Sequence, residues 1–230
     1  MRAGLVAGTA MAAAMMLAGP IVRAQDVASV LKQMDASAPK FQDIEAKITV
    51  DNYTAVVQEH ETQTGTTAFR RASHGMEMAM QLLAANGQVA TELLYKNGEL
   101  DYYQPTLKQE TIFASGSNRQ EWDSLLATGF GASGNELSAA WTVTFQGMEK
   151  VGDVPTAKLD LVPKDAKVRE NFSHLTIWVD LTRDITLKQV MVQPSGDSRT
   201  VVYSDIKYNT RVPDKMFTLK VASGTQVQRR

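Results

Sequence analysis

Residues 74–82 read HGMEMAMQL, and Met76, Met78 and Met80 recur in this stretch at a spacing of two. Because successive side chains of a β-strand point to opposite faces, the three thioethers share one face with Leu82. Strands usually favour β-branched and aromatic residues. Methionine is instead flexible and polarizable, which suits a surface that must accept variable apolar shapes. The row therefore predicts a strand with an adaptable apolar face.

Three interpretations of this methionine row stay open from the residues alone. The row can be ordinary core filling under a helix, the wall of a cavity that repacks around a ligand, or part of a copper site. Copper is considered because His74 precedes the row and soft thioethers favour Cu(I). Against copper, His60, His74 and His174 stand in no metal-ligand spacing.

The first 24 residues have the organisation of a cleavable secretion signal. A basic start at Arg2 precedes an apolar run over 5–18, and Val22-Arg23-Ala24 places small residues at the two positions that a signal peptidase reads. The apolar run is shorter than the ~18 residues that a membrane span needs. We therefore expect a soluble mature protein, residues 25–230, forming a single domain.

Net charge, cysteine content and the absence of catalytic motifs argue against several classes of function. Removing Arg2 and Arg23 from the 24 basic residues leaves 22 against 25 acidic ones, a net charge of −3, which argues against a nucleic-acid binder. The chain has no cysteine, so it carries neither a disulfide nor a lipid anchor of its own. No nucleophile elbow, HExxH, P-loop or Rossmann glycine pattern occurs, and we expect a protein that is not an enzyme.

Three short helices are expected. The first has Asp26 as its N-cap and apolar residues at helical spacing over 27–34. A capping box of Asn118 and Glu121 opens the second helix, and another, formed by Ser133 and Glu136, opens the third. The apolar side of the second helix carries Trp122, Leu125, Leu126 and Phe130.

The rest of the chain is dominated by strands. Asn86-Gly87, Asn97-Gly98 and the run 194–197 are turn signals between them. The strand-like runs are 44–50, 53–59, 65–71, 76–83, 141–149, 156–162, 172–180, 185–193, 199–208 and 216–221. The predicted fold class is mainly β (α+β): a half-open, curved antiparallel β-barrel covered by a few short helices.

Two adjacent arginines, Arg70 and Arg71, fall in one of these strands, so one of them must face inward unless both lie at an exposed edge. An inward guanidinium can donate hydrogen bonds to the backbone of a covering helix.

Three segments together resemble the periplasmic outer-membrane lipoprotein carrier family, the LolA-like proteins. They are GTTAFRRASHGMEMAMQLL (65–83), LLYKNGELDYYQPTLKQETIF (93–113) and LTIWVDLTRDITLKQVMVQPSGDSRTVVYSDIKYNTRVPDKMFTL (175–219). The resemblance covers roughly residues 27–225. Its most specific parts are the Asn-Gly hairpin before Tyr103, Gln104 and Pro105, and the C-terminal hairpin that closes with Asn209, Pro213 and Phe217.

The resemblance implies a cavity that holds the acyl chains of a lipoprotein beneath a helical lid. Arg71 would fasten this lid, although the family's arginine is followed by proline and here Ala72 follows. The lid would comprise Trp122, Leu125, Leu126 and Phe130. The cavity wall would comprise Met76, Met78, Met80, Leu93, Tyr95 and Met191.

The function expected from the resemblance is a monomeric periplasmic carrier without a cofactor. Its partners would be acylated lipoproteins, an inner-membrane lipoprotein-releasing transporter, and an outer-membrane acceptor lipoprotein or the outer membrane. The alternatives are a lipid-sensing or lipid-binding module of the same fold, and a methionine-rich copper-binding periplasmic protein.

Overall fold

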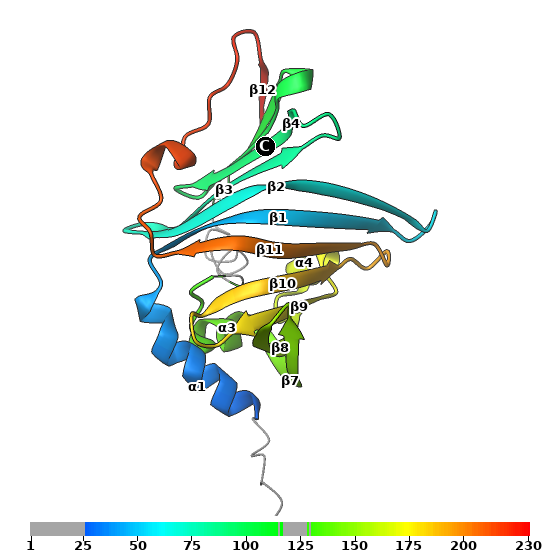
Figure 1. Ribbon diagram of the computed structural model, residues 1–230. Helices are drawn as coiled ribbons and strands as arrows, with labels where there is room; N and C mark the ends of the chain where they lie inside the picture. Colours follow the sequence, from blue (N-terminus) through cyan, green and yellow to red (C-terminus); the bar gives the residue numbers. More distant parts are fainter. Residues whose placement is uncertain (1–25, 115, 117–127, 129) are drawn as a thin grey trace, which may run out of the picture.

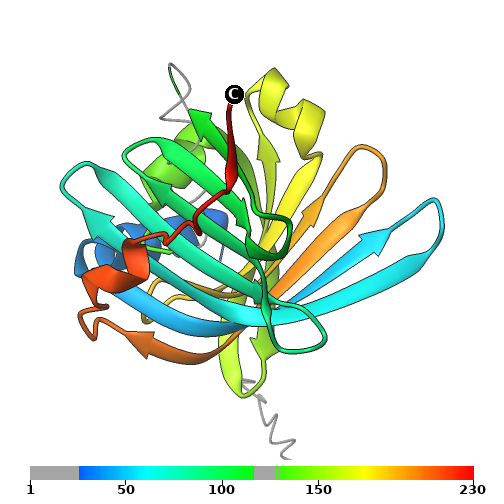
Figure 2. The same cartoon turned by 90° about the horizontal axis from the view of Figure 1, so that it is seen from above.

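A single curved sheet organises the computed structural model, which describes residues 26–114, 116, 128 and 130–230. Within these residues, twelve strands are hydrogen-bonded in the order β12-β6-β5-β4-β3-β2-β1-β11-β10-β9-β8-β7 (Figure 1). Two meanders, β1 to β6 and β7 to β11, are joined by the antiparallel pairing of β1 with β11. The sheet curls into a half-open barrel (Figure 2), which confirms the predicted fold class.

The strands are antiparallel to their neighbours except for β12, which runs parallel to β6. β1 and β2 are the longest and form one extended hairpin. The strands of the first meander are β1 (Asp43–Thr54), β2 (Glu59–Ala72), β3 (Gly75–Leu83), β4 (Val89–Lys96), β5 (Glu99–Gln104) and β6 (Gln109–Ala114). The others are β7 (Trp141–Val151), β8 (Val154–Pro163), β9 (His174–Asp180), β10 (Ile185–Val192), β11 (Ser198–Tyr208) and β12 (Gln226–Arg229).

The two helices whose predicted N-caps lie in the described residues begin where the sequence predicts. The Ser29 amide donates to Asp26 Oδ1 at 2.7 Å, and Ser133 and Glu136 form a complete capping box. A further short helix, capped by Asp165, is not among the predicted elements. The helices are α1 (Val27–Ser37), α3 (Gly134–Ala140) and α4 (Ala166–Asn171), with 3₁₀ turns η1 (Ala38–Lys40), η2 (Pro105–Leu107) and η4 (Asp214–Phe217).

Two predicted strands were wrong. The run 53–59 straddles the tip of the β1–β2 hairpin, where Thr54 pairs with Glu59 and the chain turns between them. The run 216–221 begins instead in η4, because Pro213 cannot donate to a ladder and its carbonyl accepts from the Met216 amide at 2.9 Å. Both runs have a strand-like pattern of residues, but neither has a neighbouring strand to pair with along its whole length.

The two Asn-Gly turns differ. Asn97 and Gly98 both have positive φ, 55° and 81°, as a type I′ turn requires. In the other turn only Gly87 has positive φ, and the loop is longer, closed by the Ala84 amide bonding the Gln88 carbonyl. Both positions nevertheless connect neighbouring strands, as predicted.

Three apolar clusters fill the two faces of the sheet. The methionine cluster lies on the concave face over β1 to β4, β10 and β11, and is built around Met76, Met78 and Tyr95. The helix-covered cluster lies between β7 to β9 and helices α1 and α3, around Leu159 and Leu161. The C-terminal cluster, around Phe217, lies on the convex face and is formed where residues 212–219 cross β2 to β4.

No helix in the described part of the chain is both long enough and apolar enough to cross a membrane.

Candidate functional site

The methionine row lies on the concave face, as its spacing predicts. Strand register pairs Met78 with Phe69 of β2 and with Tyr95 of β4, and pairs Met80 with Leu93. Partners in an antiparallel pair share a face, so these residues form one surface. Five of the six predicted wall residues, Met76, Met78, Met80, Leu93 and Tyr95, are thereby brought together.

This surface is covered in the structure. Met76 and Met78 are 7% and 5% exposed and Tyr95 is fully buried, while Met80 and Leu93 are half-buried. An acyl chain would therefore have to displace the side chains that pack on the methionine row. The sixth residue, Met191, packs against the helix-covered cluster instead, because it pairs with Leu175 of β9, which belongs to that cluster.

Phe130 packs at the centre of the concave face. Its ring lies 4.3 Å from that of Phe69 and 5.0 Å from that of Tyr203, and Phe130 also bridges to Ile185 of β10. The residue is 1% exposed and packs within the methionine cluster. The other predicted lid residues, Trp122, Leu125 and Leu126, lie outside the described residues.

A chain of hydrogen bonds beside Phe130 ties the two halves of the sheet. The Arg71 guanidinium at the end of β2 donates to the Gly131 carbonyl at 2.6 Å, and the Gly131 amide donates to the Asp184 carbonyl at 3.1 Å. Gly131 has φ +69°, and a Cβ there would lie 2.6 Å from Phe41 Cδ1. Only glycine fits this position.

The Asp184 side chain is an unusual member of this tie. It is 2% exposed, and its Oδ2 has no hydrogen-bond partner within the described residues. Burial raises the pKa of Asp184 to about 7, although the Arg71 guanidinium opposes this shift. No local pattern pointed to this residue, since Asp184 follows an ordinary Thr-Arg turn sequence.

Arg70 points to the opposite, convex face. Its Nε donates to Glu77 Oε2 at 2.6 Å, its Nη1 pairs with Asp214, and its guanidinium lies 4.2 Å from the Phe217 ring centroid. Arg71 therefore faces inward and bonds the carbonyl of Gly131, which lies in a turn, whereas the sequence predicted a bond to a covering helix. Arg70 serves to anchor the C-terminal segment.

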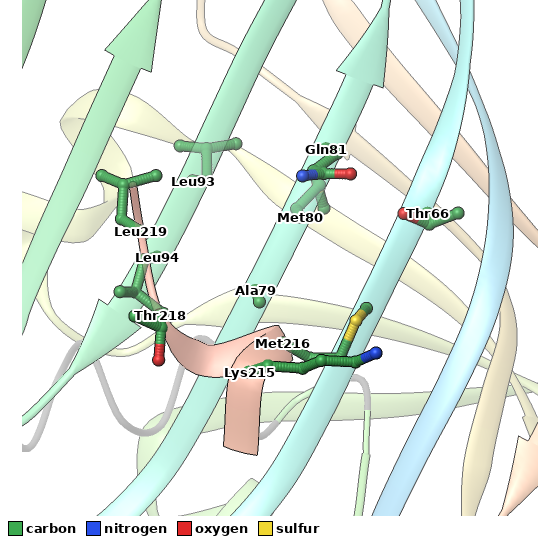
Figure 3. Close-up of a pocket in the computed structure, with 10 residues that line it drawn as sticks. All are labelled: Thr66, Ala79, Met80, Gln81, Leu93, Leu94, Lys215, Met216, Thr218 and Leu219. Carbon is green, nitrogen blue, oxygen red and sulfur yellow. The ribbon is translucent and has the colours of Figure 1, made fainter. Parts of the chain in front are cut away.

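That C-terminal segment forms a small pocket on the convex face (Figure 3). Lys215, Met216 and Leu219 lie over β2 to β4, with Ala79 and Leu94 beneath them. The pocket holds about 80 Å³, which is too small for an acyl chain. Sequence reasoning missed it because this segment was expected to be a strand.

Two of the three histidines have partners other than the methionines. His60 bonds Asp51 at 2.8 Å and His174 lies beside Ser173. Among the described residues, no three His, Cys, Asp or Glu side chains are grouped so that they could hold a metal ion.

Comparison with known proteins gives a family and a fold. A family model described as the MucB/RseB N-terminal domain matches residues 41–218. A search of curated proteins returned no match. An uncharacterized conserved protein from Thermus thermophilus superposes with a TM-score of 0.53 at 11% identity, covering 88% of this chain and 98% of that chain.

Two further solved structures are similar to this chain. MucB gives a TM-score of 0.52 at 12% identity, covering 84% of this chain and 62% of its own, so this chain spans about three fifths of that MucB. A LolA superfamily protein from Nitrosomonas europaea, NE2245, covers 84% of this chain and 98% of its own at 14% identity, with a TM-score of 0.41. The family whose model matches is thus not the carrier family that the sequence suggested.

Proposed function

This chain belongs to the MucB/RseB N-terminal domain family. We propose that it is a periplasmic protein that binds the acyl chains of lipoproteins on its concave face and carries them from the inner to the outer membrane. The mature chain, 25–230, would act as one soluble domain after removal of the signal. Its partners would be acylated lipoproteins, an inner-membrane lipoprotein-releasing transporter and an outer-membrane acceptor.

The observation that carries this proposal is the in-register methionine row. Met76, Met78 and Met80 lie in one file on the concave face of an open sheet, flanked by Tyr95 and Leu93. Thioether side chains change rotamer at low cost, so such a face can repack around chains of different length and branching. A face of Val and Ile would be fixed in one packing.

The burial of this face is consistent with reversible binding of an acyl chain. Each buried CH₂ contributes roughly 0.8 kcal/mol, so a bare apolar trough would hold a long acyl chain too tightly for release. Here the acyl chain must displace the ring of Phe130, which packs between Phe69 and Tyr203. It must also break the bond from Arg71 to the Gly131 carbonyl. These lost contacts offset part of the gain and lower the net affinity.

Native mass spectrometry of the protein purified from its own periplasm tests this function. Co-purification of an acylated protein supports the carrier. Recovery of free lipid alone supports a binding module, and recovery of a bound metal ion supports the copper alternative. The same preparation of Met148→Glu, altered at a methionine that is 51% exposed on β7, should carry the same ligand as the wild type.

The second candidate function is a lipid-binding or lipid-sensing module that holds its ligand without delivering it. The match to a family other than the carriers favours this candidate. Transfer of a preloaded fluorescent diacylated lipopeptide to acceptor membranes separates the two: a carrier releases the lipopeptide to the membranes, whereas a sensing module retains it.

A further inference from the structure

An open cleft lies at the end of the sheet where three segments meet. Gln42 and Asp43 at the start of β1, Arg70 and Arg71 at the end of β2, and Arg211 after β11 all line it. The segments are held together by backbone bonds, from the Arg71 amide to the Gln42 carbonyl at 2.8 Å and from the Asn209 amide to the Asp43 carbonyl at 2.9 Å. The cleft has a volume of about 470 Å³.

The loop that carries Arg211 is fixed in a strained conformation. Asn209 and Arg211 both have positive φ, 53° and 62°, which non-glycine residues adopt at a cost. The carboxylate of Asp43 stabilises this loop, because its Oδ1 accepts from the Thr210 and Arg211 amides at 3.0 and 3.1 Å. Strain of this kind is retained where the position of a side chain matters.

The charges around the cleft are not balanced. Arg70 is paired with Glu77 and Asp214. Within the part of the chain that the structure describes, neither Arg71 nor Arg211 forms an ion pair, and both residues are exposed. The Arg71 guanidinium donates to a neutral carbonyl, that of Gly131.

Two carboxylates lie near the cleft, and among the described residues neither forms an ion pair with Arg71 or Arg211. Asp43 is the acidic residue that lines it, and its Oδ1 is already occupied by two backbone amides. The Asp184 carboxyl is buried beside Arg71. Two guanidinium groups therefore line one cleft, and among the described residues some of their N–H donors have no acceptor. Their like charges repel each other until an anion binds between them.

From this arrangement we infer that the cleft is a binding site for a phosphate ester, held by the guanidinium groups of Arg71 and Arg211. Planar guanidinium groups donate paired hydrogen bonds that match phosphate oxygens. The cleft is larger than a phosphate ion needs, and Pro39, Phe41 and Val212 supply an apolar side for the rest of the molecule.

The position of the cleft indicates how a lipid phosphate would lie. Arg71 is directly opposite Met76 in the β2–β3 pairing, so the cleft opens at one end of the methionine row. A phospholipid could place its phosphate at Arg71 and its acyl chains along the methionines. This orientation rests on the proposed acyl-binding function, whereas the anion site itself does not.

The test compares two lipids with the same acyl chains, one with a free phosphomonoester and one whose phosphate is esterified to choline, and it adds phosphate without any acyl chain. Binding of dihexanoyl phosphatidic acid, dihexanoyl phosphatidylcholine and inorganic phosphate is measured by calorimetry for the wild type, Arg211→Gln and Arg211→Lys. Arg199→Gln is the matched control, since Arg199 lies at the other end of β11 and bonds Asn52. Circular dichroism confirms that each variant is folded.

We expect the wild type and Arg199→Gln to bind phosphatidic acid about tenfold more tightly than phosphatidylcholine. Arg211→Gln should lose this preference without weakening phosphatidylcholine binding, and Arg211→Lys should keep only part of it. Equal affinity for the two lipids in the wild type, or an unchanged preference in folded Arg211→Gln, overturns the anion site.

Binding of inorganic phosphate shows whether the ligand of the cleft is a free phosphate or a lipid. It also separates the anion site from the proposed acyl-binding function. Phosphate binding that depends on Arg211, without binding of either lipid, supports the anion site for a free phosphate and contradicts the proposed acyl-binding function. Lipid binding without any preference for phosphatidic acid supports acyl binding and contradicts the anion site.

Discussion

The two apolar clusters on the concave face are built from different residues. The helix-covered cluster consists mainly of branched aliphatic side chains, among them Leu159, Leu161, Leu175, Ile177 and Val179, packed beneath α1 and α3. The methionine cluster combines flexible thioethers with aromatic rings, among them Met76, Met78, Phe69, Phe130 and Tyr203.

This difference indicates that the two clusters have different roles within one sheet. Branched side chains under two capped helices make a core with one packing, which supplies stability. Methionines covered by Phe130 make a face that can exchange one apolar partner for another. The tie from Arg71 through Gly131 to Asp184 lies between the two halves. Four predictions test this division, from the largest expected effect to the smallest.

Met78→Glu should abolish binding of a fluorescent diacylated lipopeptide. A carboxyl group in an apolar wall without hydrogen-bond partners costs about 2–7 kcal/mol. Fluorescence titration measures the affinity, and a denaturation curve establishes that the variant folds. Met148→Glu, which places the same group at an exposed methionine, should bind normally, as should Met78→Leu, which conserves volume. Wild-type affinity in folded Met78→Glu would remove the methionine row from the site.

Leu159→Ala should lower the free energy of unfolding by about 2–5 kcal/mol and leave lipopeptide affinity unchanged, because Leu159 is fully buried in the helix-covered cluster. Urea denaturation measures the first quantity and titration of the folded protein the second. Val162→Ala, on the same strand but 38% exposed, should change stability by less than about 0.5 kcal/mol. A loss of affinity in Leu159→Ala would show that the two clusters do not act separately.

Arg71→Leu should load lipopeptide normally and release it slowly. Removing the bond to the Gly131 carbonyl favours the loaded state over the closed one by about 1–3 kcal/mol. The measurement is the rate of transfer from preloaded protein to acceptor membranes. The lipopeptide contains no phosphate, so the proposed anion site does not affect the result.

Arg70→Leu is the control for that experiment, because it disrupts contacts to Glu77 and Phe217 on the convex face only. It should lower stability and transfer cargo at the wild-type rate. Slow transfer by Arg70→Leu with normal transfer by Arg71→Leu would mean that the wrong arginine is named. If both variants transfer cargo at the wild-type rate, the bond from Arg71 to the Gly131 carbonyl does not control release.

Asp184→Asn should alter how stability depends on pH. Burial raises the pKa of Asp184 to about 7 in the folded protein, against roughly 3.9 when unfolded, so folding favours the protonated carboxyl. The resulting stabilisation is fully present below about pH 4 and is lost as pH rises through 7. The wild type should therefore lose stability between about pH 5 and 8 relative to Asp184→Asn, by at least about 1 kcal/mol.

Asp205→Asn is the matched control for the pH experiment. Asp205 also has positive φ, 49°, but it is exposed and its pKa is lowered by the hydrogen bond from Lys47. Its contribution is present above the unfolded pKa and lost as pH falls further, so it should not change between about pH 5 and 8. Parallel stability curves for the wild type and Asp184→Asn over this range would contradict a proton on Asp184.

Local patterns predicted the elements whose partners lie nearby in the chain. The capping residues Asp26 and Ser133 begin helices because each side chain bonds an amide three residues on. Asn97-Gly98 turns the chain because both residues adopt positive φ. The run 216–221 failed because an alternating pattern becomes a strand only where a neighbouring strand offers hydrogen bonds, and residues 213–217 turn instead over the convex face.

The sequence by itself determined the period-two methionine file, the helix starts and the mainly β class, since these depend on interactions over a few residues. The tertiary structure alone decided which arginine faces inward. It also decided that Met191 joins a different cluster from Met78, that Asp184 is buried beside Arg71, and that Arg211 meets Arg71 across a cleft. These relations join residues far apart in the chain, and they depend on the curvature and register of the whole sheet, which no local pattern encodes.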